Sequence, residues 1–165
     1  MSGPLPEWLP EQIDTNGTWE GILFRLHEVF DQDFTLGQPR YSGVPVWWDR
    51  HRMVGDPYDR GFWHLITRED KSSEDRLLDP PRAKRLRWCK ATIINSTPPD
   101  VLVFEYEEGK GKIRTYLWVQ QADYLVILEK QQQKTKPVYF LVTTFVLDGP
   151  SKRKDIQRKY DNRKQ

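Results

Sequence analysis

In its second half the chain reads Lys112-Ile113-Arg114-Thr115-Tyr116-Leu117-Trp118-Val119. The side chains alternate: one set is aliphatic apart from a threonine, and the other set is mainly basic and aromatic. Because successive side chains of a β-strand point to opposite faces of its sheet, this period of two predicts a strand. We expect the aliphatic face to pack on the core beneath the helices, which leaves Arg114, Tyr116 and Trp118 on the second face.

Three more segments with a period of two surround this strand, at 101–107, 124–129 and 138–147. The turn Glu108-Gly109-Lys110-Gly111, just before residue 112, is typical of a hairpin, and a loop is expected at 130–137. Four strands joined by short connections predict an antiparallel meander.

Two helices are predicted before these strands. Residues 18–31 carry apolar side chains at three- and four-residue spacing and begin at Thr18, a favoured N-cap residue. Residues 80–95 follow Asp79, a second N-cap, and place Arg82 on the inward side of the helix at its N-terminal end. The predicted fold class is therefore α+β, with N-terminal helices packed on a twisted four-stranded antiparallel β-sheet meander.

Composition narrows the class of protein. The chain has 165 residues with seven each of Trp, Tyr and Phe, an aromatic content that argues against disorder. Its single cysteine, Cys89, excludes an internal disulfide and a thiolate zinc cage, and is typical of a reducing, cytoplasmic setting. No apolar run approaches the ~18 residues of a membrane span, and the N-terminus lacks the pattern of a secretory signal, so we expect no membrane association.

Charge is distributed unevenly along the chain. Residues 1–40 hold seven acidic and two basic side chains, a net charge of −5, whereas residues 150–165 hold seven basic and two acidic ones, a net charge of +5. Residues 82–90 add five basic side chains and no acidic one. This segregation is typical of a chain that binds a polyanion with its basic part, and equally of a solvated helix face followed by a solubilising tail.

The sequence contains no metalloprotease, paired-cysteine or nucleotide-binding motif, and we expect neither a metal nor a cofactor. Of three histidines, His64 differs because it lies between Trp63 and Leu65 in a short apolar run. Either it is a core histidine, or its imidazole serves as a general acid or base, since imidazole titrates close to neutral pH.

RNA can be cleaved without a metal when its 2′-hydroxyl is deprotonated and attacks the neighbouring phosphate. The protein must then supply a histidine, cationic groups that hold the phosphate, a hydroxyl donor and aromatic surfaces on which bases stack. His64, Arg82, Arg114 and Thr143 match these roles. Three of these residues also have a structural explanation. Arg82 could be an ion-pair partner, Arg114 an ordinary exposed strand residue, and Thr143 a residue that simply favours β-strands.

Three segments follow one another within residues 60–160: Phe62-Trp63-His64-Leu65-Ile66, then Arg82-Ala83-Lys84-Arg85-Leu86-Arg87-Trp88, then a meander that ends Leu141-Val142-Thr143-Thr144-Phe145. This order resembles the BECR (barnase, EndoU, colicin, RelE) superfamily of nucleases, in the branch carried by phages and mobile elements. The resemblance implies metal-independent RNA cleavage by a toxin-like enzyme that an immunity or antitoxin protein restrains. It matches His64 to the family histidine, Arg82 or Arg85 to the cationic position, Thr143 to the late-strand hydroxyl and Tyr160 to a tail aromatic.

We therefore predict a cytoplasmic endoribonuclease that cleaves RNA, tRNA being one substrate known in the superfamily. Residues 61–165 would form the nuclease core with its basic tail, and residues 1–60 an acidic, helical and loop-rich region packed on or flanking it. The predicted catalytic residues are His64, Arg82, Arg85 and Thr143. The predicted RNA-binding residues are Arg114, Tyr116, Trp118, Lys152, Arg153, Lys159 and Tyr160, with Tyr116 and Trp118 stacking on bases.

Two alternatives stay open at this point. One is a non-catalytic RNA-binding module that uses the same basic, aromatic face. The other is a protein-interaction module, in which the acidic region 1–40 docks a partner or folds back over the basic surfaces as an inhibitor. The sequence makes no prediction of the oligomeric state.

Overall fold

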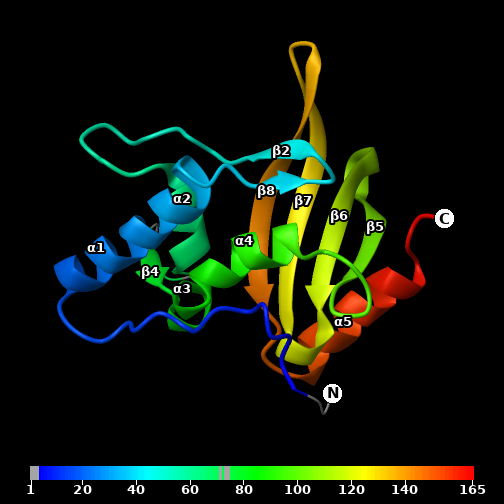
Figure 1. Ribbon diagram of the computed structural model, residues 1–165, viewed down its shortest axis with the longest axis horizontal. Helices are drawn as coiled ribbons and strands as arrows, with labels where there is room; N and C mark the ends of the chain where they lie inside the picture. The colour runs from blue at the N-terminus through cyan, green and yellow to red at the C-terminus, as the bar shows by residue number, and fades with distance from the viewer. Residues whose placement is uncertain (1–3, 71, 73–74) are drawn as a thin grey trace.

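The computed structural model of the protein describes residues 4–70, 72 and 75–165. Its largest element is a six-stranded sheet with the strand order β1-β2-β8-β7-β6-β5 (Figure 1). The strands are β1 (Arg40–Tyr41), β2 (Val44–Trp47), β5 (Leu102–Glu108), β6 (Lys112–Val119), β7 (Tyr124–Gln133) and β8 (Lys136–Val146). A separate two-stranded sheet joins β3 (Thr67–Glu69) to β4 (Arg76–Leu78).

The class α+β is right, but the predicted four-stranded antiparallel sheet is wrong. Strands β5 to β8 pair antiparallel in sequence order, but β2 adds a parallel pair to β8, at Val46–Tyr139 and Trp47–Phe140, and β1 extends the sheet further. The sequence missed β1 and β2 because strands of two and four residues are too short to show a period, and Pro45 interrupts the second.

The hairpin of β7 and β8 is longer than expected. Its strands stay paired out to Gln133 and Lys136, so most of the predicted loop 130–137 is strand. A β-bulge leaves Val142 without a partner, between the pair of Leu141 and the pair of Thr143. Because a bulge redirects the side chains around it, Thr143 does not follow the simple alternation of the rest of β8.

Hydrophobic cores lie on both faces of the six-stranded sheet. Helices α1 (Trp19–Phe30) and α4 (Leu86–Ile94) cover one face, where Leu26, Leu86 and Leu117 are buried. Helix α5 (Pro150–Asp161) covers part of the other face.

Helix α5 corrects the prediction for Tyr116 and Trp118. These side chains are only 0% and 2% exposed, because Ile156 and Tyr160 of α5 pack over them. The sequence had placed them on a face that could stack on bases, but one isoleucine in the middle of the charged tail is enough to seat the helix on their rings. Neither ring is accessible to RNA.

The helices agree with the prediction at their N-caps and differ from it elsewhere. The two predicted N-caps are confirmed, since the side chains of Thr18 and Asp79 accept hydrogen bonds from the backbone N–H groups of Gly21 and Arg82. However, the single helix expected at 80–95 is divided into α3 (Pro80–Lys84) and α4, because Arg85 leaves the helical conformation with φ −100° and ψ 19°. A further helix, α2 (Arg60–Ile66), precedes β3.

The acidic N-terminal region packs against the rest of the chain. Ile13 and Leu26 belong to the same core as Leu117, and the indole N–H of Trp88 donates to the carbonyl oxygen of Pro10 at 2.8 Å. Residues before and after position 60 therefore share one core. None of the helices in the described part of the chain combines the length and the apolar character needed to cross a membrane.

Candidate functional site

Helix α2 carries His64 and is anchored to the loop that precedes it. The backbone N–H groups of Arg60 and Gly61 donate to the carbonyl oxygens of His51 and Asp49, both at 2.8 Å. Glycine suits position 61 because a Cβ there would lie 2.9 Å from the Asp49 oxygen, closer than side chains tolerate. The loop and the first turn of α2 thus pack backbone to backbone.

The inner side of α2 is buried through Phe62, Leu65 and Ile66, whereas His64 is exposed. The reading of His64 as a core histidine is therefore wrong. His64 lies on the border between two hollows, one of about 580 Å³ that also contacts Arg76 and one of about 100 Å³ that contacts β8.

Two arginines and two threonines form a hydrogen-bonded cluster next to His64. Arg82 of α3 donates from Nη1 to the carbonyl oxygen of Thr67 at 2.7 Å and from Nη2 to Oγ1 of Thr143 at 3.3 Å. Arg76 of β4 donates to the hydroxyl and carbonyl oxygens of Thr67, at 2.7 Å and 3.0 Å. Thr67 directly follows α2, so the cluster joins the end of α2 to α3, β4 and the edge of β8.

The electrostatic environment of His64 favours its neutral form. Partial desolvation of the ring lowers its pKa from the usual 6.5, and the positive charges of Arg76 and Arg82 lower it further, against the opposing effect of Asp49 and Glu69. The imidazole is therefore a proton acceptor at neutral pH. His64, Thr67 and Arg76 line the same hollow, and Arg82 is hydrogen-bonded to Thr67.

Arg82, Arg76 and Thr143 bring hydrogen-bonding groups together at this edge of β8. Arg82 is half-buried, and its Nε is buried without a hydrogen-bond partner among the described residues, so an anion would have to approach its Nη groups. A phosphate oxygen that approaches this edge of β8 would find guanidinium N–H groups of Arg82 and Arg76 and the hydroxyl of Thr143. Guanidinium groups and hydroxyls are the donors that proteins use to hold phosphates.

Arg85 and Arg114 lie outside this cluster. Arg85 donates to the carbonyl oxygen of Pro81 at 2.8 Å, and its guanidinium carbon is 5.1 Å from the centre of the Trp88 ring. Of the two cationic residues that the sequence left open, the geometry therefore favours Arg82. Arg114 faces Glu129 at 3.7 Å on the neighbouring strand.

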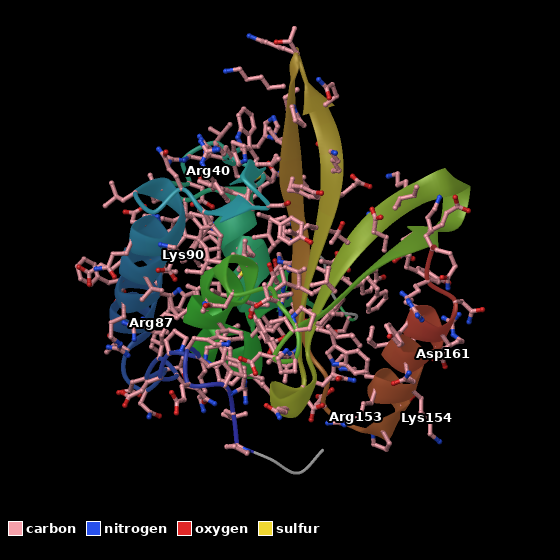
Figure 2. The ribbon with its side chains drawn as sticks, turned by 45° about the vertical axis from the view of Figure 1, so that its right-hand side comes forward. Arg40, Arg87, Lys90, Arg153, Lys154 and Asp161 are labelled. Atoms are coloured by element: carbon pink, nitrogen blue, oxygen red, sulfur yellow. The ribbon has the colours of Figure 1, made fainter. Side chains whose placement is uncertain are left out.

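The tail residues predicted to bind RNA are engaged within the chain. Three cations form ion pairs, namely Lys152–Asp148, Arg153–Asp123 and Lys159–Glu108. Tyr160 packs edge-on against Phe104, with ring centres 5.4 Å apart. Figure 2 labels Arg153 and Lys154 on α5, across the view from Arg87 and Lys90 of α4. The tail is therefore a helix that packs on the sheet and pairs several of its charges within the chain, and its role in RNA binding stays a prediction.

The sequence interpretation missed Arg76, Trp47 and Arg50. Arg76 begins β4 in a charged segment that reads as an exposed loop, and nothing local in the sequence links it to His64. Trp47 and Arg50 did leave a signal, because an aromatic pair followed closely by a basic residue is typical of nucleic-acid contacts.

The described residues contain no group of three or more His, Cys, Asp or Glu side chains arranged to hold a metal ion. Comparison of the chain with models of protein families, with curated proteins and with solved structures found no match. The resemblance to the BECR nucleases stays a prediction.

Proposed function

We propose that the protein is a metal-independent endoribonuclease in which His64 is the general acid–base. The observation that carries this proposal is an exposed imidazole whose pKa is lowered, beside Arg76 and the hydrogen-bonded pair of Arg82 and Thr143. A neutral imidazole next to two guanidinium groups is suited to remove a proton from a hydroxyl whose neighbouring phosphate those groups hold.

The reaction requires one bond to form and one to break. His64 removes the proton of the 2′-hydroxyl, O2′ attacks the adjacent phosphorus, and the bond from phosphorus to O5′ breaks as O5′ takes a proton from water. The hydroxide that is left then takes the proton from His64 and restores the neutral imidazole. The products are a 2′,3′-cyclic phosphate and a free 5′-hydroxyl. Arg76 and Arg82 stabilise the charge that develops on the non-bridging oxygens, and the hydroxyl of Thr143 donates to one of them. A toxin-like role, an immunity or antitoxin partner and a cytoplasmic location stay part of this proposal.

The test is cleavage of an end-labelled single-stranded RNA by the full chain in the presence of EDTA. Wild type should cut, and His64→Ala should lose at least ~10²-fold in rate, the scale of acid–base catalysis. His27→Gln is a matched control, because the His27 ring packs against Tyr58 and Phe62 and does not line either of the hollows that His64 borders. It should retain the wild-type rate below its melting temperature.

A second control uses the substrate instead of the protein. An oligonucleotide with a single 2′-deoxyribose at the cut position lacks the attacking hydroxyl, so it should resist cleavage at that position. Equal rates for wild type and His64→Ala would remove His64 from the mechanism. Cleavage at the deoxyribose would show that the reaction does not use the 2′-hydroxyl.

A non-catalytic RNA-binding protein is the second candidate, and the exposed Trp47 beside Arg50 favours it. Intact RNA with binding that weakens as salt rises would support this alternative. The same gel distinguishes the two, because it separates bound full-length RNA from cleaved product.

A further inference from the structure

Helix α5 covers only part of one face of the six-stranded sheet, and another part of the same face is left open. Paired residues of neighbouring strands share a face, and the register places Trp47 beside Phe140 and Phe140 beside Glu129. Gln131 and Gln133 follow Glu129 at two-residue intervals on β7, so they lie on this face as well. In Figure 1 the open part is the upper portion of β2, β8 and β7, and α5 lies below it.

This open face contains a hollow of about 560 Å³, which we call the Trp47 hollow. It is lined by Trp47, Phe140, Gln131, Gln133 and Arg50 among others, and Trp47 is 40% exposed. A volume of this order is typical of a site for a small organic group. Two aromatic side chains that lie side by side give it an apolar floor, and the amides supply polar groups around it.

The two glutamines supply the means of recognising a base edge. The Nε2 of Gln131 donates to Glu129 at 2.8 Å, which fixes the amide and leaves its oxygen free to accept. The Gln133 amide is exposed and makes no side-chain hydrogen bond to any described residue. A glutamine amide, which both donates and accepts, is the side chain that pairs with adenine through N6 and N7.

Arg50 adds a positive charge at the edge of the hollow. Its guanidinium carbon lies 4.1 Å from the centre of the Trp48 ring and 5.5 Å from that of Trp47. Stacking on indole holds a guanidinium group in place while its N–H groups stay available to a phosphate.

The Trp47 hollow adjoins the smaller hollow of His64. Trp48, Asp49 and Phe140 line both of them, so a group bound on Trp47 lies next to the space that the imidazole borders. We propose that the Trp47 hollow is a base-binding subsite for single-stranded RNA that prefers adenine and seats this base beside the phosphate at His64. The proposal rests on the proposed nuclease function for its substrate, but nucleotide binding can be measured without cleavage.

The first experiment measures binding of AMP, GMP, CMP and UMP to the full chain by calorimetry, with adenosine as a probe that lacks phosphate. AMP should bind most tightly of the four nucleotides, and adenosine should bind more tightly than guanosine when both nucleosides are measured in the same way. Trp47→Ala should weaken AMP binding by about tenfold, the scale of base stacking on an aromatic ring, whereas Trp47→Phe should retain most of it. Melting curves show that each variant is folded.

The glutamines provide a matched pair of variants. Gln133→Ala should reduce the preference for AMP over GMP by about fivefold or more. Gln132→Ala removes the same side chain from the next position of β7, which faces the other side of the sheet, and should change nothing. The proposal would be overturned if Gln133→Ala and Gln132→Ala showed the same preference for AMP over GMP, or if the protein preferred another base. AMP binding that Trp47→Ala leaves intact would also overturn it.

The outcomes separate this subsite from the nuclease function. AMP binding that depends on Trp47, in a protein that does not cut RNA, would support the subsite and refute the nuclease. RNA cleavage whose positions are the same in wild type and Trp47→Ala, with no AMP binding at millimolar concentration, would support the nuclease and refute the subsite.

Discussion

Replacing Ile156 by alanine tests whether the basic tail is part of the folded core. Ile156 is only 5% exposed and packs with Tyr116 and Trp118 beneath α5. Truncation of a buried isoleucine to alanine costs about 2–5 kcal/mol. Because α5 is a terminal helix on a partly open face, its surroundings can relax, and we expect a loss of about 2–3 kcal/mol in the free energy of unfolding.

The assay is urea denaturation of the full chain, followed by tryptophan fluorescence and far-UV circular dichroism. In a parallel thermal melt of a chain of this length, the expected loss lowers the melting temperature by about 4–12 °C. Gln157→Ala is the control: Gln157 is exposed on the next position of the same helix, so its removal should change the stability by less than about 0.5 kcal/mol. Equal stability of Ile156→Ala and Gln157→Ala would refute the packing of the tail described above.

Three further predictions concern the site and the core. If neutral His64 is the base, kcat/KM for cleavage should rise with pH through a midpoint below the usual pKa of 6.5. Arg76→Gln should move this midpoint to higher pH, because removing a nearby positive charge favours the protonated ring. Gly61→Ala should destabilise the protein by about 1–3 kcal/mol in urea, since its Cβ meets backbone at 2.9 Å, whereas Gly109→Ala, with nothing within 4 Å of its Cβ, should not. The Cys89 thiol should react with a disulfide reagent only after unfolding, because it is fully buried and burial raises its pKa; rapid reaction of the native protein would contradict this.

Local patterns in the sequence predicted local structure well. The alternation in 112–119 gives the bounds of β6, and Thr18 and Asp79 cap the helices that follow them. These features depend on near neighbours along the chain: the capping hydroxyl or carboxylate accepts a hydrogen bond from the backbone N–H three residues later. The break at Arg85 was not visible, because the sequence around it favours helix on both sides.

Features that depend on distant pairing could not be predicted. The parallel pair of β2 and β8 joins residues more than ninety positions apart in the sequence, and four residues with a proline give no periodic signal. The burial of Trp118 depends on α5, whose single buried residue is Ile156. One apolar residue among so many charges does not show which face of which sheet the helix will cover.

The distribution of charge along the sequence differs from its distribution in the fold. The tail concentrates cations in the sequence, yet acidic residues from three other segments neutralise several of them in the fold. By contrast, Arg50, Arg76 and Arg82 come from separate segments with no common pattern, and the fold brings them to both sides of His64. A phosphate backbone is recognised by cations gathered in space, and here that gathering is produced by the sheet edge at β2 and β8 together with the cluster around Thr67. Binding of single-stranded RNA should therefore weaken more on Arg50→Gln or Arg76→Gln than on Lys152→Gln, whose partner Asp148 already neutralises it.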